Sequence, residues 1–154
     1  MSCISIGLRV NPDKVTYAIL QKKDNAIRLD EIIFPVALPF AEQLSFLRTT
    51  LGTILQTYKI DCAGIKVCEG NARTVKHTRL NIEGVAQECL ASTFGDNYVC
   101  CTIPKLTAVL QYTNKKLIKL QLEGKEPNRT YPDWKQYSRE QREALLVAKA
   151  ALCK

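Results

Sequence analysis

Apolar and polar positions over the first third of the chain follow the two-residue period of β-strands. Apolar or alternating runs cover 3–10, 14–20 and 27–34, and turn-forming residues at Asn11-Pro12-Asp13 and Asp24-Asn25 separate them. Because both connections are short, consecutive strands should pair antiparallel. The pattern therefore predicts a three-stranded meander at the start of the sheet.

Further along, the apolar positions change to the period of an α-helix. Between 41 and 58 they recur at spacings of three and four, so a helix here should cover one face of the sheet. The next apolar runs predict a strand, a helix and a strand over 60–69, 78–92 and 98–103, with the last strand ending at Pro104. A strand that follows a helical crossover should run parallel to the first strand.

A last helix should begin near Ser138, whose hydroxyl can cap it together with Gln141 three residues on. Before it, the stretch 123–133 is the best loop candidate. The whole pattern predicts an α/β fold with a mixed five-stranded sheet, an antiparallel meander plus two parallel strands, and flanking helices. With 154 residues, 46% of them hydrophobic, we expect a single domain over 1–154.

The net charge of +7 indicates which kind of partner the protein binds. Lys and Arg number 22 against 15 Asp and Glu, and the isoelectric point is about 9.1. Long-range attraction favours encounters with polyanions, so DNA or RNA is a natural partner. Solvated surface lysines are the plainer interpretation of the same charge.

Cysteine and histidine usage excludes several kinds of chemistry. The chain has seven cysteines, no CxxC pair and one histidine, which argues against a zinc site and a paired secreted framework. The common nucleotide-binding and hydrolase signatures are also missing. No signal-like start or membrane-length apolar run occurs, so we expect a cytoplasmic protein with buried free thiols and no membrane contact.

Short motifs in four of the predicted elements match one superfamily. They are Ile6-Gly7-Leu8, Ala63-Gly64-Ile65, the run 81–86, and Glu140 with Glu143-Ala144-Leu145. In this order of strands and helices the chain resembles the RNase H-like superfamily, and within it the RuvC-type branch, over nearly its whole length. Its Ile82-Glu83-Gly84 and Ile103-Pro104 are also similar to a family of small bacterial proteins known by the domain-of-unknown-function label DUF3010.

The resemblance implies a cluster of Arg9, Lys66, Glu140 and Glu143, where RuvC-type nucleases have four metal-binding positions. In those nucleases the first two positions are acids, whereas a guanidinium or ammonium repels Mg²⁺. We therefore expect a vestigial site without catalytic residues or metal ligands, in which the basic groups form a salt-bridge network or bind an anion. The plainer interpretation is that both glutamates simply begin a helix, where acids are favourable.

Two groups of basic residues are candidates for contacts with phosphates. One leads into the second helix, and the other lies in the segment 105–135, which also offers aromatic rings for stacking on unpaired bases. The candidates are Arg73, Lys76, Arg79, Lys105, Lys115, Lys116, Lys119 and Trp134. The alternative for the second group is an amphipathic helix with a lysine-rich outer face.

Together these features predict a noncatalytic RNase H-like domain that binds nucleic acid through a basic surface and needs no cofactor. A first alternative is a protein-interaction subunit that uses 105–135 or an edge strand and does not contact nucleic acid. A second is a nuclease with a rebuilt acid cluster, in which Asp13 and Glu69 replace the missing acids. Only that last alternative requires Mg²⁺ or Mn²⁺.

Overall fold

The computed structural model describes residues 2–69 and 76–154, and its centre is a mixed sheet of five strands. The first three strands form an antiparallel meander, β4 pairs in parallel with β1, and β5 pairs in parallel with β4, giving the order β3-β2-β1-β4-β5. The strands are β1 (Ile4–Val10), β2 (Lys14–Gln21), β3 (Ile27–Ile33), β4 (Cys62–Lys66) and β5 (Tyr98–Cys101).

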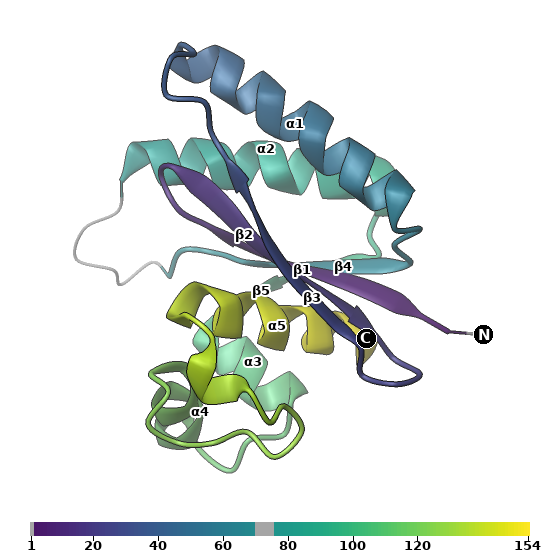
Figure 1. Cartoon of the computed structure of the whole chain (residues 1–154), viewed down its shortest axis with the longest axis vertical. Coiled ribbons are helices and arrows are strands. Elements are labelled where there is room, and N and C mark those ends of the chain that lie inside the picture. The colour runs from purple at the N-terminus through teal and green to yellow at the C-terminus, as the bar shows by residue number, and fades with distance from the viewer. Residues whose placement is uncertain (1, 70–75) are drawn as a thin grey trace.

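Helices cover both faces of this sheet (Figure 1). On one face lie α1 (Phe40–Thr57) and α2 (His77–Phe94). On the other lie α3 (Ile103–Val109), α4 (Lys115–Leu122), a short 3₁₀ turn (Trp134–Gln136) and α5 (Arg139–Leu152). The predicted α/β fold, with its mixed sheet and flanking helices, is therefore confirmed.

Each face of the sheet has its own apolar core. Buried residues of β1 such as Ile6 and Leu8 pack with Leu47 and Leu51 of α1. On the other face, the apolar side of α5 packs with residues of α3, α4 and the loop before it, including the buried Trp134. Within the described residues no helix combines the length and the apolar character that a bilayer span requires.

The predicted start of the last helix is confirmed in atomic detail. The Ser138 hydroxyl accepts a hydrogen bond from the Gln141 N–H at 3.1 Å, and the Gln141 side chain accepts one from the Ser138 N–H at 2.8 Å. This capping box satisfies two backbone donors that the first turn leaves free.

The predicted fifth strand is two residues too long. It ends at Cys101, and Pro104 belongs to the first turn of α3, where its missing N–H costs no hydrogen bond. The Thr102 side chain accepts from the Lys105 N–H and begins the helix. The predicted fourth strand is also too long, because its ladder covers Cys62–Lys66 and not 60–69.

The basic stretch after this point is two helices, not one amphipathic helix. A break between α3 and α4 includes Gln111 with φ at +57°, and Asn114 then caps α4 by accepting from the Leu117 N–H at 2.9 Å. The chain returns to the sheet through the loop that ends at Trp134. These segments form a small lobe against α5, at the bottom of Figure 1.

Glycines let α5 lie directly on the sheet. Gly7 of β1 and Gly64 of β4 are partners in the parallel register, and any side chain at Gly7 would collide with the backbone of Ala144 and Ala148. The Ser5 hydroxyl completes this contact by donating to the Ala148 carbonyl at 2.8 Å. Close packing of α5 on β1 and β4 fixes which α5 side chains reach the ends of these strands.

Candidate functional site

The candidate site lies where the carboxyl ends of β1 and β4 meet the first turns of α5. Arg9 and Lys66 are partners in the parallel register, so their Cα atoms are neighbours. Glu143 reaches them from α5 because the glycines described above bring that helix close to the sheet. The structure thus brings together three of the four residues predicted for the vestigial cluster.

Glu143 is the central acceptor of this cluster. It is only 3% exposed, its Oε2 accepts from Arg9 Nε, and its Oε1 accepts from Arg139 Nε at 3.3 Å. Arg9 also donates through Nη1 to the Val10 carbonyl and to Asn11 Oδ1. Both oxygens of one buried carboxylate are therefore occupied by guanidinium groups.

Lys66 is buried beside this pair and forms no ion pair with any residue that the structure describes. It is 6% exposed, and its Nζ donates to the Val67 carbonyl at 3.1 Å. In the described part of the chain no carboxylate oxygen lies within 4.0 Å of it. Burial lowers the pKa of Lys66 from its ordinary value, while the nearby charges of Glu143 and Glu69 oppose that shift. Its ammonium keeps donors that no described residue uses.

A second buried acid adjoins the cluster from α2. Glu83 is 4% exposed, accepts from the Cys68 N–H at 3.0 Å and pairs with Arg79 at 3.0 Å. It was not among the predicted site residues. The spacing of four from Arg79 predicts their ion pair, but such pairs are typical of exposed helix faces, so the sequence does not indicate that Glu83 is buried.

Glu140, the fourth predicted residue of the cluster, takes no part in these contacts. It lies one turn before Glu143, half-buried, and makes no ion pair within 4.0 Å among the described residues. The pKa of Lys14 on β2 is raised chiefly by a hydrogen bond to Glu31, and the charge of Glu140 adds a smaller contribution in the same direction. The structure gives it the place of an ordinary helix-starting acid.

Of the two acids considered as replacements, one caps a helix and the other is exposed. Glu69 accepts from the Ile103 N–H at 2.7 Å and so begins α3, and Asp13 is exposed in the β1–β2 turn. Within residues 2–69 and 76–154 no three His, Cys, Asp or Glu side chains gather as they would around a metal ion.

Of the residues predicted to contact nucleic acid, the described lysines are exposed, Arg79 is half-buried and Trp134 is buried. Lys76 and Arg79, at the start of α2, line a hollow of about 210 Å³ with Asn11 and Pro12 of the β1–β2 turn. Lys105 of α3 and the α4 lysines are exposed, while Arg73 lies outside the described residues. The exposed α4 lysines are Lys115, Lys116 and Lys119.

Trp134 is the buried member of this set. It is 1% exposed, its Nε1 donates to the Gln121 carbonyl at 2.8 Å, and its ring stacks on Tyr131. Its ring faces the core, so it cannot stack on a base as predicted. The loop before α5 folds inward and makes this tryptophan the centre of the α3–α4 lobe.

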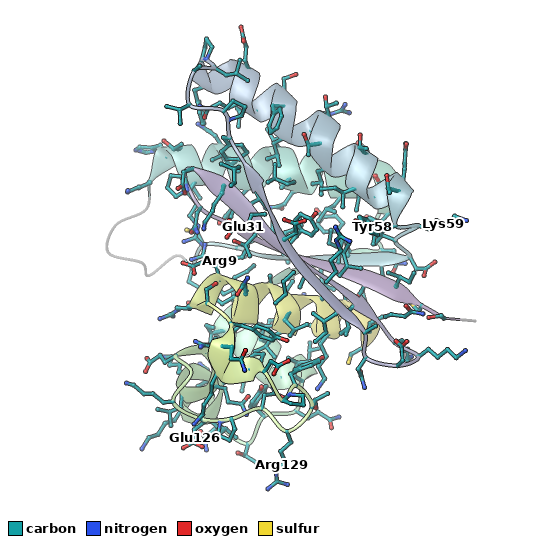
Figure 2. All side chains as sticks on the ribbon, in the orientation of Figure 1. Arg9, Glu31, Tyr58, Lys59, Glu126 and Arg129 are labelled. Atoms are coloured by element: carbon teal, nitrogen blue, oxygen red, sulfur yellow. The ribbon has the colours of Figure 1, made fainter. Side chains whose placement is uncertain are left out.

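Figure 2 shows how these groups are distributed over the molecule. Arg9 lies at one end of the sheet beside the start of α5, and Tyr58 and Lys59 lie at the other end. Glu126 and Arg129 project from the far side of the α3–α4 lobe. The cluster is thus confined to one end of the sheet, where α2 and α5 both begin.

Solved structures with this fold include DNA-processing proteins. RuvC of Thermus thermophilus is similar with a TM-score of 0.64 and 12% identity, covering 97% of this chain and 93% of that one. T. thermophilus RuvC in complex with a Holliday junction substrate gives 0.65, with the same identity and coverage. The yeast mitochondrial Holliday junction resolvase Ydc2 gives 0.58 and 9% identity, covering 97% of this chain and 77% of that one.

These similarities establish a RuvC-like RNase H fold. The predicted resemblance to the RuvC-type branch is confirmed at the level of the fold, while the similarity to DUF3010 stays a prediction. No family model matches the sequence, and no curated protein sequence matches it.

Proposed function

We propose that this chain is a noncatalytic RNase H-like domain that binds nucleic acid through its basic surface. The observation that carries the proposal is the state of Glu143, a buried carboxylate shared by Arg9 and Arg139 beside Lys66, whose ammonium has no ion pair among the described residues. A site of this charge repels a divalent cation and attracts an anion. The end of the sheet at which RuvC-type nucleases hold metal ions would here contact phosphate.

Two further observations support nucleic acid as the ligand. The net charge is +7, and exposed lysines lie on α4 and at the start of α2. One structural neighbour is described with a Holliday junction substrate, and another is named a Holliday junction resolvase. Branched DNA is therefore the first ligand to test, with single-stranded and duplex DNA and RNA beside it.

Fluorescence anisotropy at two salt concentrations, with and without Mn²⁺, tests binding and cleavage on the same samples. We expect binding that weakens steeply with salt, because each neutralised phosphate releases counterions, and no cleavage in either condition. Absence of binding at low salt would refute the proposal. Mn²⁺-dependent cleavage that Glu143→Gln abolishes would establish the nuclease alternative instead.

Replacing exposed lysines with glutamate tests which part of the surface binds nucleic acid. Lys76→Glu and the triple change of Lys115, Lys116 and Lys119 to Glu should each weaken binding, the triple by about tenfold or more at low salt. Each lost phosphate contact should reduce the salt slope by about 1. Lys59→Glu is the matched control for Lys76→Glu, because Lys59 is equally exposed but lies at the other end of the sheet. An equal loss in both would show that only net charge matters.

A protein-interaction role is the second candidate, and one observation favours it. Ile33 at the end of the edge strand β3 is 65% exposed, and Val36 just after it is 95% exposed. Exposed apolar side chains beside an unpaired strand edge are typical of contact surfaces. A stable complex that resists high salt, together with no nucleic-acid binding, would favour this role over the first.

A further inference from the structure

The opposite ends of β1 and β4 bring two thiols together. Cys3 stands just before β1, Cys62 begins β4, and their Sγ atoms are 3.9 Å apart. The two residues are 59 positions apart in the sequence, so the contact depends on the parallel pairing of these strands. Of the seven cysteines, these are the two whose thiols hydrogen-bond to each other in the described residues.

Backbone hydrogen bonds hold both cysteines in place. The Cys3 carbonyl accepts from the Lys22 N–H at 2.9 Å. The next residue, Ile4, donates to Asp61 Oδ2 at 2.7 Å and accepts from the Asp61 N–H at 2.8 Å. The peptides beside each thiol are therefore anchored, and rotation of the two side chains is the main freedom left to them.

The remaining distance is within reach of such rotation. Disulfide sulfurs lie about 2.05 Å apart, so the two Sγ atoms must approach by roughly 2 Å. Cys3 precedes the first residue of β1 and is only partly buried, so it can adjust without breaking the ladder. Cys62 is 8% exposed and stays fixed in the strand.

The two thiols differ in their access to solvent, which sets their order of reaction. Burial raises the pKa of Cys62 to about 12, while the Lys22 ammonium favours its thiolate. Cys3 is the more accessible of the two and is the sulfur that an oxidant meets first.

We propose that Cys3 and Cys62 are a site of reversible oxidation to an intramolecular disulfide, with small hydroperoxides as the oxidant. The Cys3 thiolate attacks the peroxide O–O bond, forming a sulfenic acid and releasing hydroxide, or an alkoxide from an organic hydroperoxide. The Cys62 sulfur then attacks the Cys3 sulfur, its S–H proton leaves with the displaced hydroxide as water, and the S–S bond forms. With hydrogen peroxide, two thiols give one disulfide and two molecules of water, and a dithiol reductant reverses the change.

The bond would join the two strands that carry Arg9 and Lys66 at their other ends. A crosslink that closes a loop of this length restricts the unfolded chain and stabilises the fold. The oxidation site requires no nucleic-acid binding and is independent of the function proposed above.

Peptide mapping under non-reducing conditions tests the proposal on the full chain. After treatment with hydrogen peroxide we expect the loss of two hydrogen atoms in the intact mass, a Cys3–Cys62 crosslinked peptide, and a Tm higher by about 5–10 °C. Cys3→Ser should abolish all three, whereas Cys153→Ser, which removes an exposed thiol, should leave them unchanged.

Two results would overturn the proposal. One is a Cys3 that oxidises to sulfinic acid while Cys62 stays a thiol. The other is a crosslink that joins different cysteines, such as the adjacent Cys100 and Cys101. Cys62→Ala provides a second variant, since it keeps the more accessible thiol and should stop oxidation at the sulfenic acid of Cys3 or its further products.

Discussion

Arg142 and Glu143 are neighbours in α5, and both are buried, but they serve two different regions of the molecule. Arg142 faces the α3–α4 lobe and donates to the carbonyls of Trp134, Leu122 and Lys135 at 2.9–3.1 Å. Glu143 faces the ends of β1 and β4 and receives guanidinium groups. Because adjacent positions of a helix point in different directions, these two residues belong to different sites, one structural and one the candidate functional site.

The two regions differ in how far their buried cations are satisfied. Arg142 binds three carbonyls with Nε and both terminal nitrogens, and burial lowers its pKa. Among the described residues Lys66 donates only to the Val67 carbonyl. The three carbonyls bound by Arg142 indicate a structural role, whereas the single partner of Lys66 leaves donors free for the anion proposed above.

Removing Arg142 should have the largest effect on stability. Arg142→Met leaves three backbone carbonyls without their donor, and we expect the free energy of unfolding to fall by about 3–5 kcal/mol. Urea denaturation measures it through the transition midpoint. Arg129→Met, an exposed position in the same lobe, is the control and should change stability by less than about 0.5 kcal/mol. Equal effects would contradict a structural role for Arg142.

Removing the charge of Glu143 should have the next largest effect. Glu143→Gln removes the carboxylate that compensates the half-buried Arg9 and lies near the buried Lys66, which we expect to destabilise the fold by about 2–4 kcal/mol. Glu140→Gln, one turn earlier and without an ion pair within 4.0 Å among the described residues, should cost less than about 1 kcal/mol. If the two variants were equally destabilised, the pairing of Glu143 with Arg9 would not be the reason.

The sheet could be predicted from the sequence because its signals are local. Strand periodicity, the Asn11-Pro12-Asp13 turn and the crossover rule together define β1 to β4, and Ser138 with Gln141 marks the start of α5. Each of these depends on residues within one or two elements. The crossover rule also predicted that β4 runs parallel to β1, and this is confirmed.

The α3–α4 lobe could not be predicted in the same way, because its determinants are contacts between distant segments. Nothing near Trp134 in the sequence shows that its ring is buried by a loop that folds onto α5. Gly124, with φ at +73°, is required because a side chain there would collide with the Arg142 guanidinium. That requirement exists only after α4 and α5 have packed.

Part of the candidate site was accessible to sequence reasoning and part was not. Aligning Arg9, Lys66 and Glu143 predicted their proximity, and the parallel register brings them together. That Glu140 stays outside these ion pairs depends on how α5 is rotated about its axis, which is determined by Gly7 and the small residues facing it. Sequence spacing alone assigns Glu140 and Glu143 to one helix face without this detail.

Replacing Lys66 should have a smaller effect, and in the opposite direction. Lys66→Met keeps the length of the side chain and removes a buried charge that has no carboxylate within 4.0 Å among the described residues, so stability should stay equal or rise by up to about 2 kcal/mol. Affinity for nucleic acid at low salt should nevertheless fall by about threefold to tenfold. A loss of stability would show that Lys66 is needed to neutralise Glu143, and the distinction from Arg142 would fail.

The smallest expected effect is a pH dependence of the stability difference between Lys66→Met and the parent chain. Burial lowers the pKa of Lys66, so the unfolded chain binds the ammonium proton more tightly than the folded chain. The free energy of unfolding therefore increases as the pH rises and Lys66 loses its charge in the folded state. The parent chain should therefore gain stability relative to Lys66→Met between the lowered pKa and about pH 10.5, where the unfolded lysine also loses its charge. Cysteines and tyrosines titrate in the same range in both chains, so their contribution cancels in the comparison. Urea titrations at about pH 7 and about pH 10 measure how much more stable Lys66→Met is than the parent chain. This excess should be larger at the lower pH. A difference that grows with pH would mean that Glu143 and Glu69 outweigh burial and hold Lys66 charged.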